Sequence, residues 1–333
     1  MRTIPIDKKV AILGLDNAGK TSILTTVKQK FDIDKQIRSL KPTLKVERTG
    51  IEFMGHTINN WDFGGQQKYR EEYTTHKDRY LAGVDLLFFV LDAQDSLRFD
   101  EAFSYFEDIM KYLKSNNMKV PIVVLLHKVD PSFTEDPTIQ NNLTMIKNRF
   151  QPFLETFSIR FFTTTVFELQ SIIRAFSTGI RMMYTQTEAI EKFILGLVEK
   201  LKNIMAMLIF EQSGISLGEY YLEHITLVMK KKILTLYEIA QKRIMARNIN
   251  SYEFSDRLDA FTKISGLIQS FDIDGVQFYV LLVVEEHDDL ETVVSEFNYF
   301  EQTYAEIKEI LHTILEDTPE EQKALNPNGK CSS

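Results

Sequence analysis

The sequence has almost no cysteine and no long apolar run. Its 333 residues include one cysteine, Cys331, so an internal disulfide is impossible, which fits a reducing compartment. The longest apolar runs, such as 84–91 and 276–284, are far shorter than the roughly 20 residues that a membrane-spanning helix needs. We therefore expect a cytoplasmic protein that reaches a membrane surface only through partners.

Signals of several other chemistries are missing as well. The chain has no Cys/His pair and no carboxylate dyad that would indicate another chemistry. A net charge of −8 argues against a broad surface for a nucleic-acid backbone, so we expect no nucleic-acid partner. Metal-ligand spacing is absent from the histidines other than His127, which are His56, His76, His224, His287 and His312.

What the sequence does contain is a phosphate-binding pattern. Residues 14–21, Gly-Leu-Asp-Asn-Ala-Gly-Lys-Thr, match G-x-x-x-x-G-K-[ST] between an apolar run and an expected helix. Such a loop wraps an anion with backbone N–H groups, and the helix N-terminus adds a favourable dipole. Lys20 is expected to reach the β- and γ-phosphates, and the Thr21 hydroxyl to hold Mg²⁺. The predicted phosphate-binding residues are Asp16, Asn17, Ala18, Gly19, Lys20, Thr21 and Ser22.

Two later segments supply the remaining parts of a hydrolytic site. Thr43 is predicted to bind Mg²⁺ through its hydroxyl, with a surface threonine at the start of a strand as the alternative. In Trp-Asp-Phe-Gly-Gly-Gln, residues 61–66, Asp62 is expected to hold Mg²⁺ through water, and Gly65 to approach the γ-phosphate. Gln66 is predicted to orient the attacking water. The predicted catalytic residues are therefore Gln66, Lys20 and Thr43, and the predicted Mg²⁺ ligands are Thr21, Thr43 and Asp62.

The nucleobase is indicated by His-Lys-Val-Asp at 127–130 after an apolar run. Asp130 can accept hydrogen bonds from N1–H and the exocyclic amine of guanine, a donor pair that adenine lacks. The stem of Lys128 is expected to pack on the base. His127 stands where this motif usually has asparagine, and a charged loop is the alternative interpretation. Thr165 and Val166 are expected to present backbone amides to the guanine carbonyl.

Apolar runs alternate with amphipathic stretches through the first half, which predicts an α/β domain with a mostly parallel sheet. The expected strands are 10–13, 43–53, 57–62, 84–91, 120–126 and 158–163. The expected helices are 20–30, 67–80, 98–114, 139–155 and 167–184.

The second half predicts a smaller domain with the order strand, strand, helix, strand, strand, helix. Its expected strands are 204–210, 215–221, 260–271 and 276–286, preceded by a linking helix, 188–203, and closed by a helix over 289–316. Such a sheet buries one face under helices, so we expect a second copy or related subunit on the other. The predicted domains are 1–185 and 186–317, followed by a disordered tail, 318–333.

With these motifs in place, the first half resembles a Ras-superfamily GTPase. Gly-Leu-Asp-Asn-Ala-Gly-Lys-Thr and Trp-Asp-Phe-Gly-Gly-Gln resemble both the Arf and the Rag/Gtr families. His127 and the run Phe-Thr-Thr-Thr-Val-Phe, 162–167, resemble the Rag form, and Arg2 stands where Arf proteins carry a myristoylated glycine. The second half resembles the roadblock-type domain of Rag proteins, although a longin domain has a similar layout.

This resemblance implies a nucleotide-controlled switch in nutrient signalling to the TOR kinase. It also implies a dimer with a second Rag-like or roadblock-containing subunit, together with GTPase-activating and exchange factors. Because the chain keeps Gly65 and Gln66, we expect it to hydrolyse GTP to GDP, slowly without an activating partner. A scaffold that stays bound to GTP, an Arf-like trafficking GTPase and an ATP-using enzyme remain alternatives, and homodimers and heterodimers are both open.

Overall fold

The chain folds into two compact units. The computed structural model describes residues 8–28, 46–53, 56–63, 81–184, 187–201, 204–212, 214–273, 275–285 and 300–315. One unit is formed by 8–51 and 58–183, and the other contains the chain from Tyr184 onward. The predicted domain boundary after residue 185 and the predicted tail lie outside the described residues, so both stay predictions.

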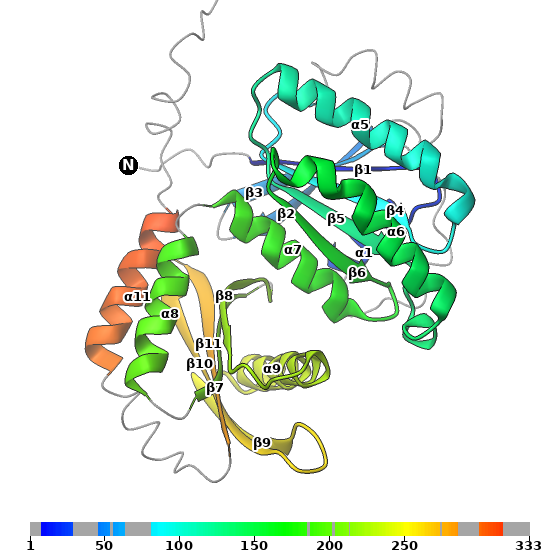
Figure 1. The fold of residues 1–333 in the computed structure, drawn as a ribbon. Helices are drawn as coiled ribbons and strands as arrows, with labels where there is room; N and C mark the ends of the chain where they lie inside the picture. The colour runs from blue at the N-terminus through cyan, green and yellow to red at the C-terminus, as the bar shows by residue number, and fades with distance from the viewer. Residues whose placement is uncertain are drawn as a thin grey trace, which may run out of the picture. The chain divides into compact units, whose positions relative to one another are not determined.

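The first unit is built on a six-stranded sheet in the order β2-β3-β1-β4-β5-β6 (Figure 1). Its strands are β1 Lys8–Gly14, β2 Val46–Phe53, β3 His56–Phe63, β4 Leu86–Asp92, β5 Ile122–His127 and β6 Ile159–Thr164. The strands from β3 to β6 pair in parallel. Two residues alone separate β2 from β3, too few for a parallel crossover, so that pair is antiparallel. The predicted α/β fold with a mostly parallel sheet is confirmed.

Helices cover both faces of this sheet (Figure 1). They are α1 Lys20–Lys28, α5 Phe99–Ser115, α6 Pro137–Leu154 and α7 Leu169–Met183, with α5 and α6 on one face and α1 and α7 on the other. Side chains of β4 alternate between the faces, since Phe89 packs on Phe106 of α5 and Phe88 stacks on Phe176 of α7. This two-sided burial explains why β4 reads as a continuous apolar run. The helix expected over 67–80 lies outside the described residues.

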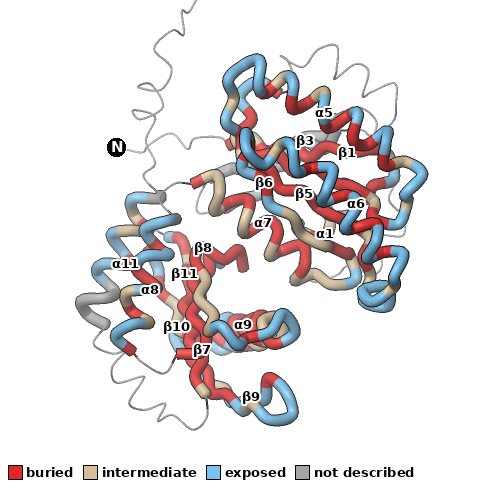
Figure 2. The backbone as a smooth tube through the Cα atoms, in the orientation of Figure 1, coloured by how far each residue is buried: buried red, intermediate tan, exposed pale blue. Residues whose placement is uncertain are grey.

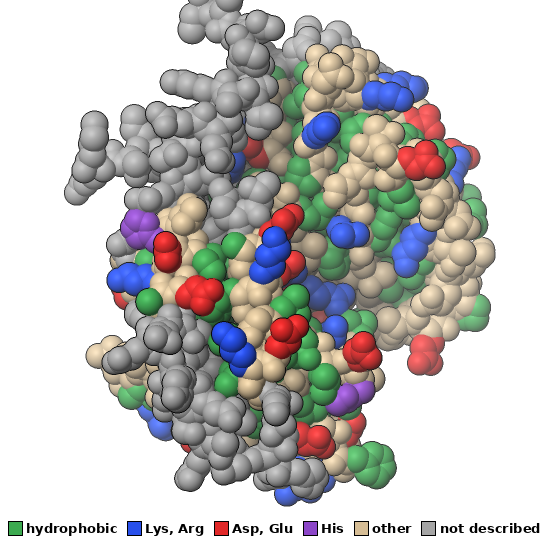
Figure 3. All heavy atoms as spheres, turned by 60° about the vertical axis from the view of Figure 1, so that its left-hand side comes forward, with side chains coloured by type: hydrophobic (Ala, Val, Ile, Leu, Met, Phe, Trp, Pro, Cys, Tyr) green, Lys and Arg blue, Asp and Glu red, His purple; other side chains and the backbone are tan. Residues whose placement is uncertain are grey.

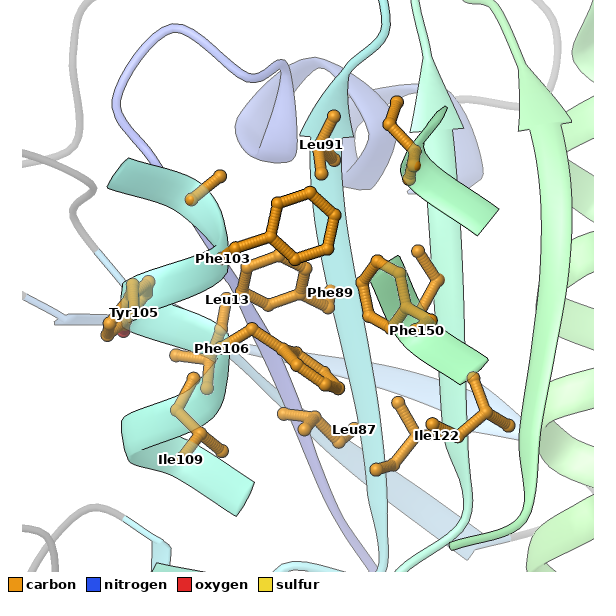
Figure 4. Close-up of a cluster of buried hydrophobic side chains, with 14 of the residues drawn as sticks. Leu13, Leu87, Phe89, Leu91, Phe103, Tyr105, Phe106, Ile109, Ile122 and Phe150 are labelled. Atoms are coloured by element: carbon orange, nitrogen blue, oxygen red, sulfur yellow. The ribbon is translucent and has the colours of Figure 1, made fainter. Parts of the chain in front are cut away.

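Aromatic side chains fill the core under α5 and α6 (Figure 4). Phe106 is completely buried, and its ring centroid lies 5.0 Å from that of Phe89 and 4.6 Å from that of Phe150. The ring centroid of Phe103 lies 5.1 Å from that of Phe150. The burial map in Figure 2 shows β4 and β5 buried along their lengths, whereas the outward sides of α5 and α6 are exposed. This core anchors the start of α5, which borders the phosphate loop.

The second unit contains a five-stranded sheet in the order β8-β7-β11-β10-β9, with antiparallel neighbours. Its strands are β7 Ile204–Glu211, β8 Ser216–Tyr221, β9 Ser251–Arg257, β10 Lys263–Ile273 and β11 Val276–Glu285. Helix α9, Leu227–Arg247, covers one face, while α8, Thr187–Lys200, and α11, Phe300–Leu315, lie on the other (Figure 1). This architecture is consistent with the predicted roadblock-like domain.

The second unit departs from prediction in two ways. Strand β9 was missed because Ser-Tyr-Glu-Phe-Ser-Asp-Arg is polar and lies at the exposed edge of the sheet. The expectation of an uncovered face is also wrong. Helix α8, expected as a linker, packs Ile190 and Ile194 so closely on β8 that a Cβ at Gly218 would lie 2.6 Å from Ile190. The chain itself therefore covers both faces of the sheet.

The surface mixes charges of both signs. On the face shown in Figure 3, acidic and basic side chains are interspersed with apolar ones rather than gathered by sign. Among the described helices, none has the length and apolar character to cross a membrane.

The aromatic core yields a stability prediction. Phe106→Ala should lower the free energy of unfolding by about 3–5 kcal/mol, because truncating a buried ring leaves a cavity between α5 and α6. Urea unfolding followed by circular dichroism measures the change. Leu97→Ala is the control because Leu97 is 95% exposed, and its cost should stay under about 0.5 kcal/mol. Equal costs for the two variants would contradict this description of the core.

Candidate functional site

The site is organised by the loop between β1 and α1. Three of its residues have positive φ angles: Gly14 at 145°, Asn17 at 60° and Gly19 at 98°. A Cβ at Gly14 would lie 2.2 Å from the carbonyl oxygen of Val90, and one at Gly19 would lie 2.4 Å from Cδ2 of His127. Both positions therefore require glycine. Left-handed residues of this kind form a concave nest of backbone N–H groups, which suits a phosphate.

Lys20 places a cation on this loop. The residue is 5% exposed, and its ammonium donates to the carbonyl oxygens of Gly14 at 3.1 Å and Leu15 at 2.8 Å. Lys20 and Thr21 are also the first residues of α1, where the helix dipole favours an anion. The predicted residues from Asp16 to Ser22 are thus brought together around one anion-binding loop, and the donor set fits a nucleotide polyphosphate.

His127 joins the phosphate loop to the end of β5. Its buried ring contacts Gly19, and Nδ1 lies 3.0 Å from Oγ1 of Thr164 on β6. Burial lowers the pKa of His127 to about 4, the charge of Lys128 adds to this effect, and Asp92 partly opposes it. The imidazole is therefore neutral at pH 7. In place of the usual asparagine, a neutral ring holds three segments of the site together.

Asp130 and Thr165, two of the residues predicted to bind the base, lie in contact. The Thr165 hydroxyl donates to Oδ1 of Asp130 at 2.5 Å and accepts from the backbone N–H of Phe167 at 3.2 Å. The N–H of Thr165 in turn donates to Ser171 Oγ at 3.1 Å. These bonds fix the loop that carries Val166 beside the carboxylate, as recognition of a guanine requires.

Lys128 is held by a segment that sequence reasoning missed. Its φ is 65°, its ammonium pairs with Asp92 at 2.7 Å, and its carbonyl oxygen accepts from Gln94 Nε2 at 2.6 Å. Asp92 ends β4. Because the carboxyl ends of parallel strands lie at the same edge of a sheet, Asp92 could have been predicted as a site residue. Nothing in the sequence pattern indicated Gln94 or Arg98, which reaches Asp16 from the same segment.

The predicted Mg²⁺ ligands and catalytic residues are placed only in part. Thr43, Gly65 and Gln66 lie outside the described residues. The backbone of Asp62 pairs with Ile12 near the end of β1, while its side chain is not described. The described residues contain no group of three or more His, Cys, Asp and Glu side chains suited to a metal. Thr21 and Asp62 nevertheless fit Mg²⁺, which takes few protein ligands beside phosphate oxygens and water.

A comparison with protein families decides between the related GTPase branches. The model described as "Gtr1/RagA G protein conserved region" matches residues 9–268, from β1 through the phosphate and guanine motifs into β10. The chain belongs to the Gtr1/RagA family. It is thus a small GTPase of the Rag/Gtr type, as its motifs predicted.

The chain is also similar to several individual proteins. Ras-related GTP-binding protein A of Dictyostelium discoideum is 23% identical over 269 residues, which covers 77% of this chain and 86% of that protein. ADP-ribosylation factor-like protein 3 of Caenorhabditis elegans is 30% identical over 145 residues, 42% of this chain and 73% of its own length. The Arl6 BBS3 small GTPase of Trypanosoma brucei, solved with bound GppNp, shares 20% identity and a TM-score of 0.42 over 53% of this chain and 97% of that chain.

The burial of His127 predicts that the stability of the first unit depends on pH. Because its pKa is lower in the folded than in the unfolded chain, the unfolded state binds a proton first as the pH falls. Above about pH 6.5 His127 does not lower the free energy of unfolding. As the pH falls toward 4, protonation of His127 in the unfolded chain lowers that free energy by about 3 kcal/mol in total. His127→Asn should lack this contribution. Unfolding free energies of both proteins from pH 7.5 to 4.5 test the prediction, and curves that stay parallel would contradict it.

Proposed function

We propose that this protein is a GTP-hydrolysing switch that works with Mg²⁺. The observation that carries the proposal is the Thr165–Asp130 hydrogen bond, which holds a carboxylate ready for guanine. The Gly19–His127 contact supports it further, since it joins the phosphate loop to the residues preceding Asp130. Adenine lacks the donor pair that Asp130 would bind, so the arrangement favours GTP over ATP.

The proposed hydrolysis divides the work among the predicted residues. Lys20 and the start of α1 hold the β- and γ-phosphates, and Gln66 orients a water molecule toward the γ-phosphorus. A bond forms between that water and phosphorus while the bond to the β–γ bridging oxygen breaks, which leaves GDP and inorganic phosphate. Thr21, Thr43 and Asp62 would hold Mg²⁺, which would stabilise the charge on the phosphate oxygens.

We further propose that turnover is slow without an activating partner. Among the described residues, the arginine at the phosphate loop is Arg98, and Asp16 and Glu101 already engage its guanidinium. A cation from outside the chain would therefore complete the site, as in other GTPases that need an activating protein. Exchange factors would act in the opposite direction by promoting GDP release.

A second Rag-like subunit is the partner that we propose for the second unit. Strand β9 forms an edge of the sheet, and most of its residues are exposed. On α9, Val228 and Ile239 are 72% and 44% exposed and lie eleven residues apart, which places them on the same side of the helix, with Lys232 and Thr235 between them. An open strand edge beside two exposed apolar side chains favours pairing with a similar domain. By family resemblance, the dimer would recruit partners at an endomembrane in nutrient signalling to the TOR kinase.

The nucleobase assignment is testable with one substitution. Asp130→Asn should weaken GTP binding by at least about 100-fold and favour XTP, because the amide can donate to the extra carbonyl of xanthine. Titration with fluorescent GTP and XTP measures the shift. Asp136→Asn is the matched control, since Asp136 caps α6 and asparagine caps a helix equally well. An unchanged preference for GTP in Asp130→Asn would contradict the assignment.

Phosphate release tests the hydrolytic step separately. Single-turnover assays with candidate activating proteins should show release from the unmodified chain and far less from Gln66→Leu. A chain that binds GTP tightly but releases no phosphate with any partner would be a GTP-bound scaffold instead.

The dimer surface yields its own prediction. The double variant Val228→Asp/Ile239→Asp should abolish dimer formation because it replaces the two exposed apolar side chains on this side of α9 with charges. Light scattering of the full chain, alone and with a Rag-type subunit, gives the mass of the complex. Leu195→Asp on α8 is the control, since Leu195 is 51% exposed on the opposite side of the sheet. A dimer that survives the α9 substitutions but not the control would place the interface elsewhere.

A further inference from the structure

Arg98 ties the phosphate loop to the start of α5. Its Nη2 lies 2.6 Å from Oδ1 of Asp16, and Nη1 donates to the Asp16 carbonyl oxygen at 3.2 Å. The other side of the guanidinium, Nε, donates to Glu101 at 2.9 Å. The planar group thus makes two bonds to one loop residue while a second carboxylate orients it.

The local fold holds Arg98 in this position. The residue ends a short 3₁₀ turn, Ser96–Arg98, and directly precedes α5. The next residue, Phe99, is buried in the core below, and Glu101 lies in the first turn of the helix. The guanidinium therefore projects from a fixed backbone rather than from a free loop.

Asp16 creates an electrostatic problem that Arg98 solves. The aspartate lies within the loop whose N–H groups face a polyphosphate, and an uncompensated carboxylate there would repel it. A cavity of about 20 Å³, with room for about one water, lies between the loop and the start of α5, and Asp16 and Arg98 line it together with Leu15 and Phe99. The ion pair therefore connects the loop to α5 beside this cavity.

We propose that Arg98 is a positioning residue that neutralises Asp16, ties the phosphate loop to α5 and thereby slows nucleotide release. This inference rests on the proposed binding of GTP. Since the repulsion grows with the charge of the ligand, loss of Arg98 should affect GTP more than GDP. An ordinary exposed ion pair would have little effect on either, because such pairs contribute little and are screened by salt.

The experiment is a double-mutant cycle on the full chain. Dissociation rates of fluorescent GTP and GDP are measured for the unmodified protein, Arg98→Ala, Asp16→Ala and the double variant. Arg98→Ala should release GTP roughly tenfold faster, with a smaller change for GDP and a smaller effect at high salt. The double variant should recover most of the loss, because it no longer carries the unpaired carboxylate. Arg98→Lys keeps the charge and should recover part of it.

Arg149→Ala is the control. Arg149 of α6 pairs with Asp100 of α5 at 2.5 Å, so this variant removes another arginine ion pair that involves α5 but lies away from the loop. The proposal is overturned if Arg98→Ala behaves like Arg149→Ala, or if the double variant is no slower in release than Arg98→Ala. Arg98→Gln, which also removes the charge, supplies the same readout if the alanine variant fails to fold. Failure of the unmodified chain to bind GTP would instead contradict the proposed function.

Discussion

The contact between Gly19 and the ring of His127 is the constraint on which the rest of the site depends. It requires a residue without a side chain at position 19, and it fixes the distance between the phosphate loop and the strand that leads to Asp130. The imidazole of His127 is larger than the side chain of the usual asparagine. It is accommodated in this buried position as a neutral ring that is hydrogen-bonded to Thr164. Phosphate and base recognition are therefore parts of one packed assembly, joined by the carboxyl ends of neighbouring strands.

The segment between β4 and α5 extends this assembly. Asp92 and Gln94 hold Lys128 on the base side, while Arg98 holds Asp16 on the phosphate side. A movement of the start of α5 would consequently reach both halves of the nucleotide site. The hydrophobic anchoring of Phe99 and Phe106 gives that segment its fixed position.

Sequence reasoning found the fold of the first unit because each of its signals is local. Glycines in a phosphate loop, two-sided burial of β4 and the order of the motifs are all visible along the chain. It failed for β9, whose polar residues become a strand only through pairing with β10. It found the helix α8 but not its packing on β8, because an apolar side on a helix does not show what the helix packs against. Arg98 was missed for the same reason, since 82 residues separate it from Asp16. Thr43 and Gln66 stay predictions.

The helices on both faces of the second sheet have a consequence for the proposed dimer. Helices α8, α9 and α11 cover the core of this unit within one chain. A protein that must hide its core in a dimer has no folded monomer, whereas the proposed dimer of this chain would separate into subunits whose cores stay covered. Such assemblies would be governed by concentration and exchange, so that one pool of chains could be redistributed among different partners.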